Sequence, residues 1–491
     1  MSVTSSGPIV AGPDPRRWRA LALLCVAGFM VILDSQIVVL ALPSIADGLD
    51  FSAGGAQWVM SAYLLSFGGL LLLGGRVADL LGRRRVFMTG TLLFGLSSLL
   101  CGFAWTAGVL VAARAVQGVS AAVMAPTALS ILLNTFEEGA ERNKALALWS
   151  GSGGFGATAA LLIGGPLTGV LGWQWVFFLN VPVALLLLAL SPLLLRESRT
   201  DARSRSYDPV GALVVTAALV ACVYAVVEAP RAGWLSARTT GLLAVSVVLT
   251  LLFVRIEARS RSPLVPLRLL RTRSVSGGNL VVFLLGGSAF GMSYTLSQYG
   301  QGVLGYSPLR FGLYNVVMPA TAVIGSYAGQ ALVTRAGTRP VAVGGLTLVG
   351  AGSLLLAGAG VGGGFVRDLL PGLLLFGSGL GACAVAGSIA ALTGVGERES
   401  GVASGINTAA FQIGGAFGVA VVSSVALSYT RGADRLVALT AGYQAAFMAC
   451  VVLAAAGAAC ALFLLRRPQR PSSREAVETP DTAVTASRAR P

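Results

Sequence analysis

The sequence predicts an all-α integral membrane protein with fourteen transmembrane helices. Of its 491 residues, 55% are hydrophobic and only 11% are charged, whereas a soluble globular protein carries about 25% charged residues. The apolar residues gather in runs of about 20 residues, the length that an α-helix needs to cross the hydrocarbon core of a bilayer. This composition excludes a soluble fold.

The fourteen apolar runs form a group of six, a pair, and a second group of six. The expected spans lie near residues 20–42, 56–74, 86–104, 107–133, 145–170, 175–195, 210–229, 239–255, 275–297, 309–332, 340–360, 369–393, 401–428 and 439–465.

Basic residues outnumber acidic ones by 35 to 20, which in a soluble protein would suggest a nucleic-acid partner. With fourteen spans, however, 28 of the 35 basic residues fall on the side of the two termini. Cytoplasmic loops are enriched in Lys and Arg, so we expect both termini to be cytoplasmic and no nucleic acid to bind. The excess of arginine over lysine indicates a GC-rich bacterial genome, and therefore a bacterial inner membrane.

The chain divides into five expected segments. Residues 1–19 lack the apolar core of a signal peptide and form a cytoplasmic tail, and residues 466–491 have the composition of a disordered tail. Between them we expect a six-helix bundle at 20–195, two inserted helices with basic linkers at 196–274, and a second six-helix bundle at 275–465.

Asp34 is the only one of twenty acidic residues that falls deep inside an expected span. It lies 14 residues after Ala20, about 21 Å along the helix. An ionisable side chain at this depth is costly, and such residues usually face a water-filled path for ions or protons. The chain has no histidine, so proton transfer would rest on carboxylates, and His-ligated metals and His-based catalysis are excluded.

Arg114, in the fourth span, lies at a depth similar to that of Asp34. Burial favours the protonated form of a carboxyl group and a neighbouring arginine favours the ionised form. Asp34 could therefore bind and release a proton as its surroundings change. The alternative is a fixed ion pair that holds the two helices together.

A tight turn follows the second span, with the sequence GRVADLLGRRR at residues 75–85. Its glycines permit close helix approach, and Asp79 can bind arginines or cap a helix. This turn resembles the signature loop of the major facilitator superfamily, and a weaker copy at 329–339 indicates two related halves. We interpret the loop as a cytoplasmic gate; the alternative is charge that only sets topology. The gate residues are Gly75, Asp79, Gly82, Arg83 and Arg84.

Further motifs resemble one branch of that superfamily, the fourteen-span drug:proton antiporters. They are LDSQIVVLALP at residues 33–43, RAVQG at 114–118, WQWVFFLNVP at 173–182, QGVLGYSPL at 301–309, and the glycine-rich helix at 401–418. The resemblance implies the major facilitator fold, proton coupling through Arg114, and a monomer.

The antiporter motif of the fifth span is altered. Gly156 and the pair Gly164 and Gly165 are in register with it, but Ala160 and Leu161 replace its central Gly-Pro. That Gly-Pro would bend the helix and open a groove for a neighbour. Pro166 is the residue that would supply a displaced kink.

Polar and aromatic residues within the spans are candidates for lining a substrate path, because amides and aromatic rings suit bulky amphipathic compounds. For each residue singly, helix packing or anchoring at the lipid interface is the alternative. The set is Gln36, Trp58, Tyr63, Gln117, Tyr294, Gln298, Gln301, Asn315, Met318, Asn407, Phe411 and Gln412.

The sequence therefore predicts a proton-coupled multidrug or secondary-metabolite exporter that confers antibiotic resistance and works by alternating access. It would need no cofactor and no metal, because the proton gradient supplies the energy. The second half has no acid inside its spans, which suits monovalent cationic, zwitterionic or neutral substrates. Proton-linked nutrient uptake and lipid flipping are the alternatives. An enzyme is disfavoured because no catalytic constellation is present.

Overall fold

The computed structural model describes residues 15–52, 54–137, 139–198, 208–260, 263–430 and 434–465. Within these ranges every regular element is a helix, and fourteen helical segments are long and apolar enough to cross a membrane. The predicted fold class and the predicted number of spans are confirmed. Residues 1–14 and 466–491 of the two expected tails lie outside the described residues.

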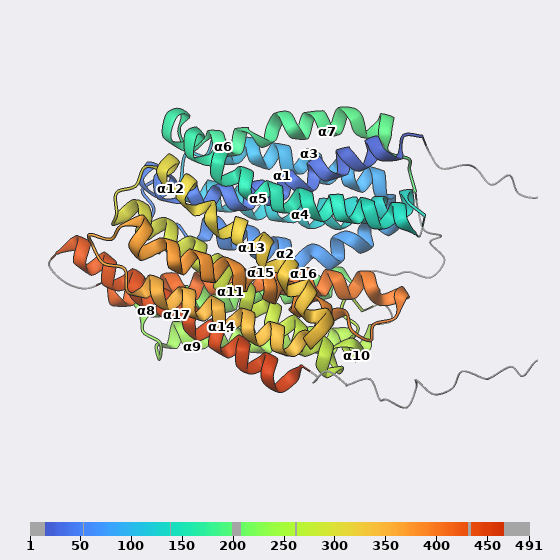
Figure 1. Cartoon of the computed structure of the whole chain (residues 1–491). Helices are drawn as coiled ribbons and strands as arrows, with labels where there is room; N and C mark the ends of the chain where they lie inside the picture. The colour runs from blue at the N-terminus through green and yellow to red at the C-terminus, as the bar shows by residue number, and fades with distance from the viewer. Residues whose placement is uncertain are drawn as a thin grey trace, which may run out of the picture.

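The first six spans form one bundle, coloured blue to green in Figure 1. They are α1 (Arg17–Gly48), α2 (Trp58–Leu81), α3 (Arg83–Gly102), α4 (Ala107–Thr135), α5 (Ala140–Pro166) continued by the π-helical turn η1 (Leu167–Leu171), and the short α6 (Trp175–Phe178) continued by α7 (Asn180–Leu194).

The inserted pair is α8 (Pro209–Ala232) and α9 (Ala237–Arg259), and the short α10 (Leu267–Leu270) follows it. The last six spans form the second bundle, coloured yellow-green to red in Figure 1. They are α11 (Arg273–Gly302), α12 (Pro308–Asn315) continued by α13 (Val317–Ala336), α14 (Thr338–Ala357), η3 (Phe365–Leu369) continued by α15 (Leu370–Leu392), α16 (Glu397–Tyr429) and α17 (Arg435–Leu464).

Side-chain caps explain where several spans begin. Thr106 accepts a hydrogen bond from the backbone N–H of Val109 at 3.3 Å, and α4 starts one residue later. Asp208 does the same for Gly211 at 2.7 Å ahead of α8. Such caps satisfy N–H groups that the first turn of a helix leaves without a partner.

The two halves repeat the same helix contacts. A Cβ atom on Gly118 of α4 would lie 2.4 Å from the carbonyl oxygen of Tyr63 in α2. A Cβ atom on Gly377 of α15 would lie 2.4 Å from the carbonyl oxygen of Met318 in α13. Only glycine permits this approach, so the α2–α4 contact corresponds to the α13–α15 contact. Residues that precede Gly118 and Gly377 by the same number of positions in the sequence correspond as well.

The ends of the bundle differ in charge. The end that carries Arg84, Arg85, Arg268 and Arg273, at the α10 side of Figure 1, is named here the basic end. The end that carries the α11–α12 turn is the opposite end.

At the opposite end the halves are joined through α1. Pro43 lies inside α1 and has no N–H to offer the carbonyl of Val39, four residues earlier. Ser297 of α11 donates its hydroxyl to that carbonyl at 2.7 Å. Gln301 donates to the next carbonyl, of Leu40, at 2.9 Å. The proline therefore does not end the helix where the sequence predicts, because the other half supplies the missing donor.

The inserted helix α8 bridges the two halves on one side. It packs against both α2 and α16, whereas α9 packs mainly on α8. A Cβ atom on Gly69 of α2 would lie 2.5 Å from Thr216 of α8, and Ser424 of α16 donates to the carbonyl of Val226 at 2.8 Å. This pair of helices therefore covers the α2–α16 boundary.

The fifth span is unbroken where the antiporter motif would bend it. α5 runs through Ala160 and Leu161 and ends at Pro166, and the π-helical turn η1 follows directly. Irregular turns of this kind commonly form next to proline. The irregularity is therefore displaced by five residues toward the opposite end.

Candidate functional site

Asp34 and Arg114 form a buried ion pair inside the N-terminal half. Arg114 Nη1 lies 2.7 Å from Asp34 Oδ2, and the two residues are 0% and 1% exposed. Asp34 comes from the middle of α1 and Arg114 from α4, so two helices each contribute one charge at the same depth. The expected proximity of the two charges is present.

Two amides complete the shell around the carboxylate. Asp34 Oδ1 accepts hydrogen bonds from Gln117 Nε2 at 3.0 Å and from Asn180 Nδ2 at 2.8 Å. Gln117 lies three residues after Arg114, so one face of α4 presents both side chains. Asn180 is the first residue of α7, directly after the break that follows α6. Both carboxylate oxygens therefore have hydrogen-bond donors.

Arg114 has further partners that do not depend on Asp34. Its Nε donates to the carbonyl of Val59 at 2.9 Å, and Nη1 also donates to Gln117 Oε1 at 2.6 Å. The guanidinium carbon lies 4.2 Å from the centroid of the Tyr63 ring, within the range of a cation–π contact. The guanidinium group is thus held from several sides.

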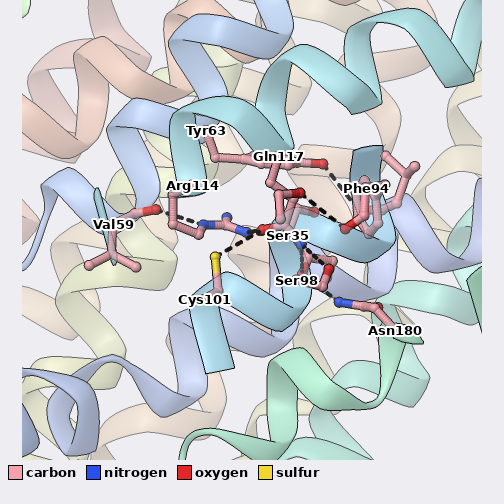
Figure 2. A network of polar contacts seen from close by, with 12 residues as sticks. Ser35, Val59, Tyr63, Phe94, Ser98, Cys101, Arg114, Gln117 and Asn180 are labelled. Carbon is pink, nitrogen blue, oxygen red and sulfur yellow. Dashed lines mark hydrogen bonds and ion pairs between the residues drawn. The ribbon is translucent and has the colours of Figure 1, made fainter. Parts of the chain in front are cut away.

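The network continues into α3, as Figure 2 shows. Gln117 Nε2 donates to Ser98 Oγ at 2.7 Å, and Cys101 Sγ lies 3.8 Å from Gln117 Oε1. Sequence reasoning missed Ser98 and Asn180 as site residues. Asn180 lies within the motif at residues 173–182, which was the available signal, whereas a serine in an apolar helix is too common to stand out.

Asp34 lines neither of the two cavities that the described residues form between the halves. Its neighbours Ser35 and Gln36 line the large cavity between the halves, while Asp34 points to α4 and α7 inside the bundle. The sealed pair is the arrangement that the fixed-ion-pair alternative expects. The expectation of a water-exposed carboxylate does not hold for this conformation, because successive helix residues point about 100° apart.

The large cavity has a volume of about 910 Å³ and lies between the halves. Gly75, Arg76, Pro263, Arg268 and Glu399 line its mouth, so it opens at the basic end. A smaller cavity of about 270 Å³ adjoins it, and Gln36, Phe290 and Phe411 line both. The protein is therefore open at one end and closed by α1 and α11 at the other.

Five of the predicted lining residues line these cavities. Gln36, Asn315, Met318 and Phe411 line the smaller one, and Gln412 lines the large one.

The other seven predicted lining residues are not among the cavity walls, because each packs elsewhere. Tyr63 and Gln117 belong to the Arg114 network, and the Trp58 ring lies 6.0 Å from that of Tyr224 in α8. Gln301 binds the carbonyl of Leu40. The remaining three lie inside the C-terminal half: Tyr294 is hydrogen-bonded to Gln298, and Asn407 accepts from Ser388 and donates to Asn279.

The predicted gate loop is bound to the start of the linker that follows the N-terminal bundle. Gly82 ends α2 with a φ of 102°, a left-handed conformation that favours glycine. The backbone N–H of Arg83 donates to Ser198 at 3.1 Å, and that of Arg84 donates to Glu197 at 3.1 Å. Gly75 lines the cavity mouth, and the side chain of Asp79 lies outside the described part of the structure.

Glu257 is a second buried acid that the sequence placed in a basic cytoplasmic segment. It lies in the last turns of α9 and is 3% exposed. It accepts a hydrogen bond from the backbone N–H of Val265 at 3.2 Å. The segment after α9 folds back over the helix end, which hydropathy cannot predict.

Comparison with known proteins decides the family. The sequence profile of the Major Facilitator Superfamily matches residues 24–419. The chain belongs to the major facilitator superfamily. It is thus a multi-pass membrane protein of a family of transporters.

Relatives with antibiotic-related names match most of the chain. The puromycin resistance protein pur8 of Streptomyces alboniger is 40% identical, over 85% of this chain and 84% of that protein. The cephamycin export protein CmcT of Amycolatopsis lactamdurans is 36% identical, over 88% and 89%. Among solved structures, the nucleoside transporter NupG matches with a TM-score of 0.66 at 13% identity, over 90% of this chain and 99% of that one, which shows a shared fold.

Proposed function

We propose that this superfamily member exports small amphipathic molecules in exchange for protons, by alternating access. The large cavity carries the proposal, because it lies between the two halves, opens at the basic end and is closed at the opposite end. A cavity of this kind can load a substrate at one end. It releases that substrate once the halves close at the basic end and part at the opposite end.

The lining of the cavity favours bulky amphipathic substrates. Phe67, Trp149, Phe290 and Phe411 supply aromatic surface, and Gln412 supplies an amide. Aromatic rings bind apolar and cationic groups, and scattered amides orient polar ones. Relatives named for puromycin resistance and cephamycin export are consistent with an antibiotic or a secondary metabolite as substrate.

Asp34 is the proposed protonation site. α1 carries Asp34 on the face that meets α4 and α7, and Ser35 and Gln36 on the face that meets the cavity. A tilt or rotation of this one helix therefore changes the surroundings of the carboxylate and the shape of the cavity together. Proton binding and substrate binding would be linked through α1.

The ion pair is suited to breaking as well as to holding. Removing one partner of a buried pair is costly when the other charge is left uncompensated. Protonation of Asp34 leaves Arg114 with Val59, Gln117 and the Tyr63 ring. These partners lower the free-energy cost of separating Arg114 from Asp34. They therefore favour a pair that opens during transport over a fixed ion pair.

The remaining parts of the proposal follow from charge and energy. The basic end is the cytoplasmic one, because cytoplasmic loops are enriched in arginine. The cavity would then be open to the cytoplasm of a bacterial cell. A proton gradient supplies the energy, with no cofactor, no metal and no enzymatic step, and a single chain is the working unit.

The experiment compares wild-type protein with Asp34→Asn in proteoliposomes. Ethidium and puromycin serve as probes, and two quantities are measured: accumulation driven by a proton gradient, and exchange of labelled probe without a gradient. We expect Asp34→Asn to abolish gradient-driven accumulation and to retain exchange. Glu228→Gln is the matched control, because Glu228 pairs with Arg238 in the inserted helices and makes no hydrogen bond to Asp34, Arg114 or Gln117 in the described structure, and it should retain both.

Unchanged gradient-driven accumulation in Asp34→Asn would contradict the proton role of this residue. Loss of both activities together with a lower unfolding temperature would support the fixed ion pair instead. A wild-type protein that moves neither probe against a gradient would count against the export function.

A further inference from the structure

The two sides of the boundary between the halves differ. On one side α2 and α16 stay in contact toward the basic end, because a Cβ atom on Gly68 would lie 2.8 Å from Ile413 and one on Gly405 would lie 2.6 Å from Leu72. α8 packs over this side. Access from the bilayer is therefore blocked there.

On the other side α5 meets the C-terminal half only toward the opposite end. A Cβ atom on Gly165 would lie 2.7 Å from Leu309, whereas Cβ atoms on Gly151 and Gly154 would find no atom within 4 Å. α5 also meets α12 at Leu161, whose carbonyl oxygen would lie 2.4 Å from a Cβ atom on Gly312, and it diverges from α13 beyond that level toward the basic end. Among the described elements, neither inserted helix makes an extended contact with α5 or α13.

The smaller cavity lies at this diverging side. Gly154, Ala157 and Leu161 of α5 line it, facing Ala322 and Val323 of α13. Gly154 is exposed, and Val323 is 46% exposed. Gly154 lies about 21 Å from the start of α5 and Val323 about 20 Å from the end of α13. The exposed edge of the cavity is therefore at mid-membrane depth, where the surrounding medium is lipid.

One buried polar atom in the wall of this cavity has no partner. Asn315 is 3% exposed, and its Oδ1 accepts no hydrogen bond within the described structure. An unsatisfied buried acceptor costs about 1–3 kcal/mol. Asn315 is the last residue of α12, at the break before α13. A ligand with a hydrogen-bond donor would satisfy this oxygen.

We propose that the smaller cavity is an entry subsite, reached from the bilayer between α5 and α13, where Asn315 accepts a hydrogen bond from an amphipathic substrate. This inference rests on the proposed export function and adds the route and the chemical class. None of the residues that line this cavity carries a charge. The substrate therefore partitions into lipid and presents a hydroxyl, amide or amine donor.

Two variants test the route and the acceptor separately. Gly154→Trp adds a ring where an added side chain meets open space, so it obstructs the gap without disturbing packing. Gly151→Trp is the matched control, because Gly151 also faces open space but lines neither cavity. Asn315→Leu removes the acceptor at similar volume.

Ethidium, which carries aromatic amines, is compared with tetraphenylphosphonium, which has no N–H or O–H group. Initial rates and half-saturating concentrations of proton-driven transport are measured for both probes in proteoliposomes. Gly154→Trp should lose most of the initial rate for both probes, while Gly151→Trp keeps it. Asn315→Leu should raise the half-saturating ethidium concentration about tenfold, the equivalent of one hydrogen bond, and leave tetraphenylphosphonium unchanged.

Three results overturn the inference while wild-type transport is intact. They are a wild-type rate in Gly154→Trp, equal losses in the two tryptophan variants, and an equal shift of both probes in Asn315→Leu. If wild-type protein moves neither probe, the proposed export function is wrong, and the entry route that rests on it is wrong as well.

Discussion

At the α2–α4 contact the N-terminal half buries Arg114 and Gln117 around Asp34, whereas at the corresponding α13–α15 contact the C-terminal half buries Leu373 and Phe376. The two helix contacts have the same geometry, but the buried side chains are polar and charged in one half and apolar in the other. A helix contact of this geometry can therefore form without buried charges. The polar network is an addition to one half, which is consistent with a coupling role that the other half does not share.

Removing the arginine should have the largest effect. Arg114→Ala leaves Asp34 buried without its counter-charge, which costs about 3–5 kcal/mol in soluble proteins. The unfolding temperature in detergent should fall steeply, and adding Asp34→Asn should restore part of it. Leu373→Ala in the other half leaves only a void, so Asp34→Asn should not restore that variant. If Asp34→Asn changed the unfolding temperatures of Arg114→Ala and Leu373→Ala by the same amount, the proposed difference between the halves would be wrong.

Filling the two matched glycines should have an intermediate effect. Gly118→Ala and Gly377→Ala both push a methyl group against a carbonyl oxygen, and overpacking typically costs about 1–3 kcal/mol. Both should lower the unfolding temperature by similar amounts. Only Gly118→Ala should also change the pH dependence of transport, because it lies next to Gln117. A change with Gly377→Ala would show that coupling extends to the C-terminal half.

Removing one amide should have the smallest effect. Asn180→Leu deletes one of the hydrogen-bond donors to Asp34, while Gln117 and Arg114 remain. The unfolding temperature and the rate of gradient-driven accumulation should both fall slightly, because one hydrogen bond contributes about 0.5–1.5 kcal/mol. Val181→Leu, at the next position, is the control. An Asn180→Leu variant that matches Val181→Leu in both measurements would contradict a role for this hydrogen bond.

The number of spans could be predicted from sequence because a helix must match the bilayer in length and apolarity. Helix ends could not be, since α1 continues past Pro43 with a donor from α11 that no local pattern reveals. The Asp34 and Arg114 pair could be predicted because charges in apolar helices are rare. Their shared depth followed from residue counts alone.

The faces of the helices could not be predicted. α1 has no separate polar face, because Asp34, Ser35 and Gln36 are consecutive and point in different directions, so its sequence does not indicate that Gln36 meets the cavity and Asp34 the bundle interior. Trp58 and Gln301 were expected in the cavity, and they pack against α8 and α1 instead. Rotation about a helix axis depends on neighbours far away in sequence, which hydropathy does not encode.

The carbonyl of Val39 sets a condition on how the opposite end can open. Within α1 it has no N–H donor, because Pro43 occupies the position that would supply one. Ser297 supplies the donor only while the halves are joined. Once they part, water must take the place of that hydroxyl, or the oxygen remains bare at a cost of about 1–3 kcal/mol. Opening of this end and entry of water would therefore occur together. Loss of that water would favour the closed state, in which Ser297 again donates to Val39.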